Sequence, residues 1–559
     1  MQTDAHNLLP PMWNLFLDFV DAAARTDPAP AADREAENEA HALLTKARAT
    51  LLSLDDDALM RIAAQVQEPA KAPAALRFAL AAARLAPARV TAQFAAGLAL
   101  QFANRHADAV EPYRRALAID PTFPNLRNNL AISLMLIKSE RGEVDRLLED
   151  AVAADPGNSR AWINLALLRP TDTDLARPHD AARRALALAP HDPLAINNYA
   201  MVCKEAQDWD EAERAARAAC EYAPNEASSR FNLAILQLLR GDYAEGWAGH
   251  ELRWRGSREL ASGRPAFAKP QWHGEPLAGR TLLLWGEQGM GDLLQFARYV
   301  PMLAERVHRE GGKLVWNSFP QMGALLSRSF AGHVDLYCSG GPVEALPPHD
   351  CEVSLLSLPF LFDTRDDTLP GPTGYLTADP ARAAYWRERL AADAGPRRLK
   401  VGLAWTGSLT HQRNPYRRVG LERFAQAFAG MASDVAFYSL QPGAQADVEA
   451  ARAAGFAIAD YSAEWPNFDE TAAFVDGLDL VISVCTSAAH LAGALRKRAW
   501  VLLDVNPHWV WQLDRRDSPW YPNTTLYRQK QFRDWTPVLD AVSADLAALA
   551  RESREAASA

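Results

Sequence analysis

Cysteine is scarce in this chain of 559 residues, and its pattern excludes two common classes of protein. The count is five, an odd number, and no two cysteines have C-x-x-C spacing. A disulfide scaffold needs paired cysteines, and a structural zinc site needs closely spaced ones. The sequence therefore predicts a protein of a reducing cytoplasm with no zinc site and no metal centre. The five are Cys203, Cys220, Cys338, Cys351 and Cys485.

Excess positive charge and long apolar runs are also missing. The formal net charge is -10, whereas a nucleic-acid or anionic-membrane partner requires a basic face. No apolar run reaches the roughly 18 residues that a membrane span needs. The N-terminal apolar patch is interrupted by Asp18, so no signal peptide is expected. The length favours about three or four domains of a water-soluble protein.

Five prolines recur at a nearly constant interval in the first half of the chain. The prolines are separated by 34, 35, 34 and 34 residues, with an alanine five positions before each and a small residue ten positions after. Small residues allow the two helices of a hairpin to approach closely, and this period is that of tetratricopeptide repeats. We expect a right-handed solenoid over 76–256, after an irregular helical segment over 1–75 with a break at 27–32. The prolines are Pro87, Pro121, Pro156, Pro190 and Pro224.

One asparagine stands eight positions after four of these prolines. An asparagine amide both donates and accepts hydrogen bonds, so a ladder of amides can hold a peptide backbone without reading its side chains. Two interpretations stay open: the ladder binds an extended acceptor polypeptide, or asparagine is simply frequent at this repeat position. The first repeat has Ala95 instead. The asparagine ladder consists of Asn129, Asn164, Asn198 and Asn232.

The second half alternates strand-like runs with helical stretches, which predicts parallel sheets covered by helices. We expect two Rossmann-like lobes over 257–394 and 395–559 that face one cleft, with a C-terminal helix over 538–550 crossing back onto the first lobe. The overall class is an α-helical solenoid followed by α/β. The expected strands are 281–285, 313–317, 334–338, 351–356, 399–406, 435–440, 480–484 and 499–504.

A glycine-rich bend joins the strand 282–285 to a predicted helix over 293–307. Gly286, Gly289 and Gly291 have G-x-x-G-x-G spacing, so the dinucleotide fingerprint is not met. Asp292 stands at the start of the helix, where the dipole favours an ionised carboxylate. Ligands of α/β proteins bind beyond the carboxyl ends of strands, so Asp292 is a candidate base. The alternative is a plain helix-capping acid.

A second candidate site follows the strand 480–484. Thr486 and Ser487 are good N-cap residues, and free N–H groups at a helix start bind phosphate. His490 lies one turn further and is either a ligand contact or a structural histidine. Two neighbouring loops add donor-binding candidates: His411, Asn414, Arg417 and Arg418 in 406–418, and Gln441 after the strand 435–440.

These stretches resemble the heptosyltransferase-like glycosyltransferases of GT-B fold, especially bacterial ones fused to tetratricopeptide repeats. The resemblance covers about 80 to 540, and the whole plan is similar to repeat-bearing protein O-glycosyltransferases, some of which modify flagellin. It implies an inverting, metal-independent transfer from a nucleotide sugar to Ser or Thr of a protein in the cytoplasm. Asp292 would be the base, with Glu287 in reserve. The matching stretches are 286–292, 407–418, 439–441, 483–492 and 517–522.

Cys485 departs from the family pattern, because heptosyltransferases carry an aspartate there that touches the donor sugar. ADP-heptose is therefore a poor expectation, and a different sugar, such as a nonulosonic acid, or lost activity would account for the change. Two alternative functions follow. One is transfer to a lipopolysaccharide core or another glycan, and the other is a non-catalytic repeat scaffold with degenerate lobes.

Overall fold

The computed structural model describes residues 45, 49, 52–168, 175–260, 262–287, 289–371, 374–395, 399–409, 411 and 413–558. Most of the predicted N-terminal helical segment, including its break at 27–32, lies outside the described residues. The chain divides into two compact units, one of residues 1–170 with 176–199 and one of 171–175 with 200–559. The boundary falls inside the helix α11 (Pro193–Glu205).

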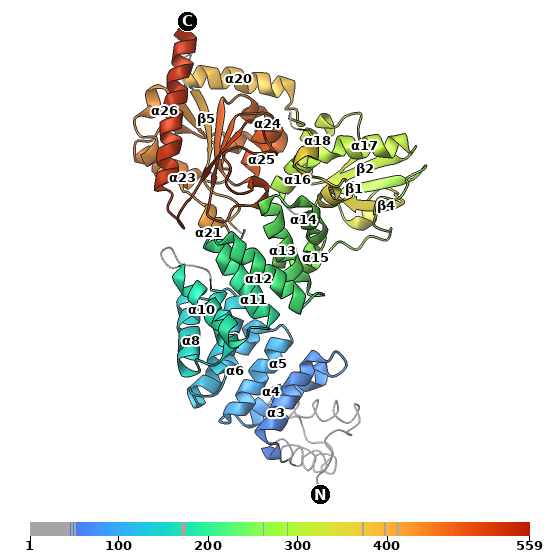
Figure 1. The fold of residues 1–559 in the computed structure, drawn as a ribbon, viewed down its shortest axis with the longest axis vertical. Helices are drawn as coiled ribbons and strands as arrows, with labels where there is room; N and C mark the ends of the chain where they lie inside the picture. The colour runs from blue at the N-terminus through green and yellow to red at the C-terminus, as the bar shows by residue number, and fades with distance from the viewer. Residues whose placement is uncertain are drawn as a thin grey trace, which may run out of the picture. The chain divides into compact units, whose positions relative to one another are not determined.

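The first unit is built of helix hairpins (Figure 1). The second helix of each hairpin ends two residues before one of the regularly spaced prolines, as α6 does at Ile119 before Pro121. The small residue of each repeat has the expected role, since a Cβ on Gly97 would lie 2.6 Å from the ring of Tyr113. The predicted repeat pattern is confirmed. Before α11 the helices are α3 (Asp56–Ala64), η2 (Gln65–Gln67), α4 (Ala72–Leu85), α5 (Val90–Phe102), α6 (His106–Ile119), α7 (Leu126–Leu136), α8 (Arg141–Ala154), α9 (Ser159–Ala166) and α10 (Ala176–Leu188).

The second unit opens with the last helices of the solenoid. Tyr243 and Trp247 of α14 are buried in the same hydrophobic core as Trp509 and Trp520, which lie 260 residues or more further along. The indole of Trp520 also donates to the Tyr243 hydroxyl at 2.9 Å. The end of the solenoid and the lobes therefore share one core. These helices are α12 (Trp209–Tyr222), α13 (Ala227–Arg240), α14 (Tyr243–His250), α15 (Arg253–Gly256) and η3 (Arg258–Leu260).

The first lobe contains a parallel sheet of order β3-β2-β1-β4. Its strand order reverses between β1 and β4, which are hydrogen-bonded neighbours. The helix predicted over 293–307 is two helices, because a short 3-10 turn separates α16 from α17, whose second residue is Pro301. The elements are β1 (Thr281–Trp285), α16 (Met290–Phe296), η4 (Ala297–Tyr299), α17 (Val300–Arg309), β2 (Lys313–Ser318), η5 (Pro320–Met322), α18 (Gly323–Ser329), β3 (Leu336–Ser339), η6 (Val343–Ala345), β4 (Cys351–Ser354), η7 (Leu355–Ser357), α19 (Leu358–Leu361) and η8 (Asp366–Thr368).

The second lobe contains a parallel sheet of order β10-β9-β8-β5-β6-β7, so its reversal lies between β5 and β8. Two strands were not predicted, β7 and β10. The elements are α20 (Pro380–Ala394), β5 (Leu399–Ala404), α21 (Asn414–Arg417), α22 (Leu421–Ala427), η9 (Met431–Ser433), β6 (Val435–Ser439), α23 (Gln445–Ala453), β7 (Ile458–Ala459), η10 (Ser462–Glu464), α24 (Phe468–Asp476), β8 (Leu480–Val484), α25 (Ser487–Ala494), β9 (Ala499–Leu503), η11 (Trp509–Trp511), β10 (Thr524–Arg528) and α26 (Thr536–Ser558).

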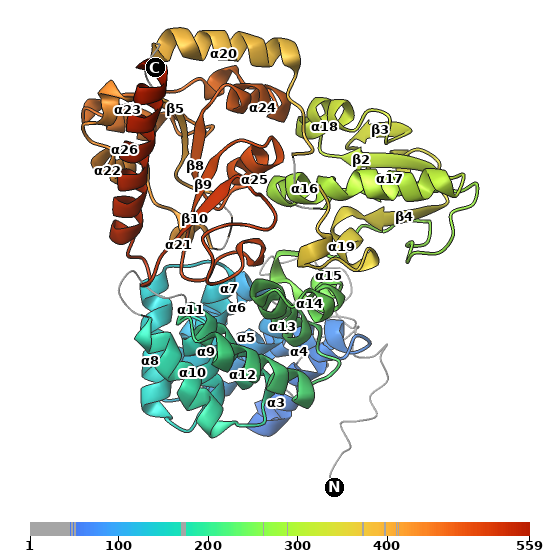
Figure 2. The same cartoon turned by 45° about the horizontal axis from the view of Figure 1, so that its top comes forward.

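The C-terminal helix α26 corrects one expectation. It packs on α22 and β10 of its own lobe and does not cross back to the first (Figure 2). Its apolar residues Val542 and Leu546 are fully buried in the core of the second lobe. Tyr527 of β10 donates to Asp545 of the helix at 2.7 Å. Among the described residues, no helix combines the length and apolarity that crossing a membrane would require.

Arg298 links the two lobes directly. It belongs to the first lobe, is 2% exposed, and donates to the backbone oxygen of Trp520 at 2.7 Å. Its guanidinium also lies over the rings of Tyr375, Trp520 and Tyr521 at 4.9 to 5.0 Å from each centroid. Aromatic faces favour a desolvated cation in this arrangement. The lobes are therefore joined by a specific buried contact.

Candidate active site at the junction of the two lobes

The starts of α16 and α25 meet where the two lobes touch, and we call residues 289–292 and 486–490 the junction. Figures 1 and 2 both show these helices side by side. A Cβ on Gly291 would lie 3.1 Å from His490 Cδ2 and 3.7 Å from Ser487 Cα. Both segments follow a central strand, β1 or β8, at the point where strand order reverses in its sheet. Ligands of open α/β sheets bind at such switch points.

Gly289 starts α16 with a backbone that other residues rarely adopt. Its φ is +99°, and it is the N-cap residue of the helix. A side chain at this position would be strained and would also meet the carboxylate of Asp292. Gly289 therefore brings Asp292 close to the bend.

Asp292 is half-buried in the first turn of α16. Burial, followed by the negative charges of Glu287 and Glu259, raises its pKa to about 7, and Arg417 acts in the opposite direction. We expected the helix dipole to keep this carboxylate ionised, and desolvation outweighs that effect. Its carboxylate forms no hydrogen bond or ion pair with any described residue. A carboxylate that titrates near neutral pH suits proton transfer.

Glu287, the reserve base, is committed to a buried ion pair. It is 5% exposed, and its carboxylate accepts from Arg253 Nε at 2.9 Å. Arg253 Nη2 donates to it as well, and so does the Ser354 hydroxyl. Removing a charge from such a pair is costly, because the partner is left buried and uncompensated. The geometry gives Glu287 a structural task.

The start of α25 carries the second set of predicted residues. Thr486 is the N-cap, and its hydroxyl accepts from Ala488 N at 3.2 Å. Ser487 is half-buried, and its N–H makes no hydrogen bond among the described residues. One backbone donor at this helix start is therefore available to an anion.

His490 is buried and neutral. It is 5% exposed, its Nδ1 lies 3.0 Å from the Tyr521 hydroxyl, and its ring stacks on Trp511. Burial, then the positive charge of neighbouring groups, lowers its pKa to about 3. The structure therefore favours the structural reading, in which the ring fills the space beside Gly291.

The loop 406–418 is organised by Asn414, whose side chain faces inward. Asn414 is 4% exposed, accepts from Gly407 N at 2.7 Å and donates to the Thr406 hydroxyl at 3.0 Å. Gln441 closes the same corner by accepting from Thr406 N at 3.4 Å. These contacts place Asn414 and Gln441 behind the loop backbone, next to the ends of β5 and β6.

Arg417 is the cation that this loop brings to the junction. It is half-buried, and a Cβ on Gly407 would lie 2.6 Å from its Cζ, so the guanidinium needs a glycine there. Its positive charge lowers the pKa of Asp292 on the first lobe and of Cys485 on the second, so Arg417 is close enough to act on both lobes. Arg417 forms no ion pair with any acid in the described part of the chain. A charged group without a counter-ion is suited to an anionic ligand.

The remaining predicted residues of this loop lie elsewhere. Arg418 is exposed. His411 is half-buried; its Nδ1 accepts from Arg413 N at 3.1 Å, and its Nε2 lies 3.8 Å from Glu259. Neither contact shows that these side chains serve a ligand, so their donor-binding role stays a prediction.

Cys485 directly precedes the α25 N-cap and is half-buried. Its sulfur accepts from the Trp511 indole at 3.1 Å. Burial raises the pKa of the thiol. The position therefore offers an uncharged group where the resemblance to heptosyltransferases implied an aspartate.

The asparagine ladder is partly used within the solenoid. In the first unit, Asn164 Nδ2 donates to Asn128 of the preceding repeat at 2.8 Å. Asn129 is half-buried, and Asn198 is 5% exposed with an Nδ2 that finds no acceptor among the described residues. Asn232 lies in the second unit and is half-buried. Their role in binding an acceptor stays a prediction.

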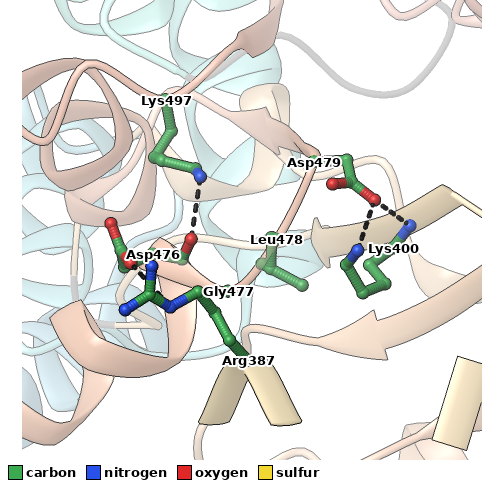
Figure 3. Close-up of a pocket in the computed structure, with 7 residues that line it drawn as sticks. All are labelled: Arg387, Lys400, Asp476, Gly477, Leu478, Asp479 and Lys497. Carbon is green, nitrogen blue, oxygen red and sulfur yellow. Dashed lines mark hydrogen bonds and ion pairs between the residues drawn. The ribbon is translucent and has the colours of Figure 1, made fainter. Parts of the chain in front are cut away.

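A hollow of about 400 Å³ lies at the opposite edge of the second sheet, beside the amino ends of β5 and β8 (Figure 3). Its cations are already occupied: Lys400 pairs with Asp479 at 3.0 Å, and Lys497 Nζ donates to Asp476 O at 2.8 Å. The hollow is separate from the junction, because the junction lies beyond the carboxyl ends of the strands. Its lining residues are Arg387, Lys400, Asp476, Gly477, Leu478, Asp479 and Lys497.

Comparison with known proteins finds relatives by sequence and solved structures with a similar fold. No protein-family model matches the chain. Protein FlbA of Caulobacter vibrioides is 27% identical over 452 residues, which cover 75% of this chain and 72% of FlbA. The Escherichia coli ADP-heptose lipopolysaccharide heptosyltransferase II aligns with a TM-score of 0.35 and 13% identity over 49% of this chain and 99% of its own. Pseudomonas aeruginosa PilF aligns with a TM-score of 0.32 and 20% identity over 38% of this chain and 97% of its own.

The recognition made from the sequence is confirmed. Helix hairpins with a 34-residue period are followed by two parallel sheets, each with a reversal of strand order. This architecture fits the predicted fusion of tetratricopeptide repeats with a heptosyltransferase-like unit of GT-B plan. Three residues near this site were not predicted from the sequence. Glu205 and Asp504 contact Arg413 of the loop 406–418, and Asn506 contacts Glu205. The signal for Asp504 and Asn506 was their place just after β9.

Proposed function

We propose that this protein is a cytoplasmic O-glycosyltransferase that moves a sugar from a nucleotide-sugar donor to Ser or Thr of a protein. The observation that carries the proposal is that Asp292 and Arg417 act on each other electrostatically at the junction while neither has an ion-pair partner among the described residues. They come from different lobes, influence each other electrostatically, and form no ion pair with each other or with other described residues. Glycosyl transfer needs a base to take the proton of the acceptor hydroxyl and a cation to stabilise the leaving phosphate. Asp292 and Arg417 match these two needs.

The proposed reaction transfers one proton, forms one bond and breaks one bond. The acceptor hydroxyl gives its proton to Asp292 while its oxygen forms a bond with the anomeric carbon. The bond between that carbon and the phosphate oxygen breaks, and the nucleotide leaves with the electron pair. General-base help of this kind contributes about 10²- to 10⁴-fold. Attack from the face opposite the phosphate inverts the anomeric centre, and no step calls for a metal.

The leaving phosphate would be held on the second lobe. Arg417 supplies the charge, and the Ser487 N–H at the start of α25 supplies an oriented donor. Preorganised donors aimed at developing charge are often the largest catalytic term. Thr486 contributes by shaping the helix start, because its hydroxyl is already bonded to Ala488 N.

The acceptor is proposed to be a polypeptide, with flagellin as one candidate from the family resemblance. The ladder supports this, because Asn129 and Asn232 are only half-buried and an amide can both donate to and accept from a peptide backbone. Asn164 contributes less, since its donor is bonded to Asn128. A glycolipid acceptor has no use for an extended peptide groove.

The test combines ligand binding with intact-mass analysis. A thermal-shift panel of UDP, GDP, ADP and CMP should single out one nucleotide, because a hundredfold excess over Kd stabilises by about 2.7 kcal/mol. Flagellin co-expressed with the protein should gain the mass of one or more sugars. Asp292→Asn should abolish the gain while the nucleotide still binds. If the flagellin mass is unchanged and a glycan is modified instead, the acceptor is a glycan and not a protein. If no nucleotide stabilises the protein, the result supports a non-catalytic repeat scaffold.

A further inference from the structure

The last turn of α11, a solenoid helix, reaches the loops that flank the junction on the second lobe. Glu205 is 15% exposed at its side chain, and its carboxylate is contacted by both Arg413 and Asn506. Arg413 Nη1 forms the ion pair, Arg413 Nη2 lies at 3.3 Å, and Asn506 Nδ2 donates at 2.8 Å. One carboxylate thus holds two loops that are 93 positions apart in the chain.

These two loops follow the central strand β5 and its near neighbour β9. Arg413 belongs to 406–418, the loop that presents Arg417 four residues later. Asn506 belongs to the segment between β9 and η11, which leads to Trp511, the partner of Cys485. Asp504 in the same segment accepts from Arg413 Nη2 at 2.8 Å and ties the loops to each other.

Glu205 is one of two carboxylates that oppose the cations of this cluster. Arg413 and Lys204 are the cations, and Asp504 and Glu205 are the anions. Lys204 is 6% exposed, and burial lowers its pKa to about 8, against the opposing pull of Glu205. Without the Glu205 charge, Arg413 would keep Asp504 as its remaining carboxylate partner among the described residues, and the buried Lys204 would lose the attraction of Glu205. Uncompensated buried charge is costly, so the loops would shift to admit water or an anion.

We propose that Glu205 is a positioning residue for the donor: a solenoid side chain that sets the two loops from which Arg417 reaches the nucleotide phosphate. The inference rests on the proposed function and deepens it, because it makes the repeats part of the donor site as well as of the acceptor site. A displacement of Arg413 would be transmitted along the short helix α21 (Asn414–Arg417) to Arg417.

A nearby glutamate provides a matched control. Glu213 on α12 is 20% exposed at its side chain and pairs with Arg217 at 2.8 Å and Arg240 at 3.1 Å. It thus resembles Glu205 in residue type, burial and number of partners, but its partners lie on α12 and α13 rather than on the lobe loops. Glu205→Gln and Glu213→Gln remove equivalent charges from the solenoid.

The experiment measures the affinity of full-length protein for whichever of UDP, GDP, ADP and CMP stabilises the wild type. Glu205→Gln should raise the Kd for that nucleotide at least tenfold, Glu205→Asp should restore it to within about threefold, and Glu213→Gln should leave it unchanged. If Glu205→Gln binds as the wild type does, or if both glutamine variants weaken binding equally, the inference is overturned while the proposed function stands. If the wild type binds none of the four nucleotides, the proposed function fails and the inference falls with it.

Discussion

Gly291 and His490 meet across the lobes, and the pair leaves no room for a side chain. A Cβ at residue 291 would come within 3.1 Å of His490 Cδ2, and the imidazole is held by Tyr521 and stacked on Trp511. Because the ring is held in place, a side chain at residue 291 would have to move the starts of α16 and α25 apart by a few tenths of an ångström. The distance between Asp292 and the start of α25 depends on this contact.

Gly291→Ala should therefore push the two helices apart. Overpacking of a close contact typically costs about 1–3 kcal/mol, and we expect the lower end because a shift of a few tenths of an ångström relieves it. Transfer activity should fall at least tenfold, since base and leaving group lose their alignment. Urea unfolding and initial rates check this. Gly142→Ala is the control, because nothing lies within 4 Å of a Cβ at that site; equal effects of both changes would contradict the prediction.

The rate of sugar transfer should follow the ionisation of Asp292. With a pKa of about 7, the carboxylate is mostly protonated at pH 6 and mostly ionised at pH 8. A base must be deprotonated, so kcat should rise by roughly tenfold over this interval. A pH–rate profile with saturating donor measures it. A profile that is flat from pH 6 to 8 would exclude Asp292 as the base.

The same ionisation lowers the free energy of unfolding. The folded protein binds the Asp292 proton up to about pH 7, and the unfolded chain releases it near 3.8, so stability falls as pH rises between these values. At about 1.4 kcal/mol per pKa unit the full effect is roughly 4 kcal/mol, and about 2 kcal/mol is expected for a half-buried group screened by water. Asp292→Asn should match the wild type at pH 4 and exceed it by that amount at pH 8. Denaturant midpoints at the two pH values test the sign.

Glu287→Gln should damage the fold rather than the chemistry. The change leaves Arg253 buried without its main counter-ion, and breaking such a pair costs about 3–5 kcal/mol. Glu245→Gln is the comparison, because it breaks an exposed pair with Arg217 and should cost under about 1 kcal/mol. Guanidinium unfolding distinguishes them. A Glu287→Gln protein of normal stability and no activity would instead make Glu287 the base.

Arg417→Ala should weaken nucleotide binding by about 10- to 100-fold, the loss expected for one charge-assisted contact of roughly 1.5–3 kcal/mol. Arg418→Ala, which removes an equal charge from an exposed neighbouring position, should change affinity less than threefold. Isothermal titration with the stabilising nucleotide measures both. Equal losses would mean that general charge attraction, rather than a specific contact, holds the phosphate.

The repeat and strand patterns could be predicted because their causes are local. Each second hairpin helix ends just before its proline, as α6 does before Pro121, and apolar runs such as 480–484 form central strands with the expected bounds. Asp292 and Ser487 converge for a similarly simple reason. The carboxyl ends of parallel strands share one edge of a sheet, so residues that follow β1 and β8 were bound to lie at ligand-binding edges.

The roles of individual side chains depended on distant partners that leave no local pattern. Glu287 looked available until Arg253, 34 residues earlier, was found beside it. Asn414 and Arg417 occupy one loop and look equally suited to a ligand. Asn414 is buried and hydrogen-bonded to Gly407 N and Thr406, whereas Arg417 is half-buried and has no acidic partner among the described residues. The dipole argument for Asp292 omitted desolvation, because burial by the opposite lobe cannot be read from a helix start.

The core shared by α14 and the lobes restricts how this protein could be rebuilt. Tyr243 and Trp247 lie among Trp509 and Trp520, so a cut near residue 256 would divide one interior between two fragments. Chimaeras that exchange repeats to redirect substrate choice should therefore place their seam upstream of residue 200, where the chain itself separates into compact units. The final hairpins are better treated as belonging to the enzyme, with only the preceding repeats interchangeable.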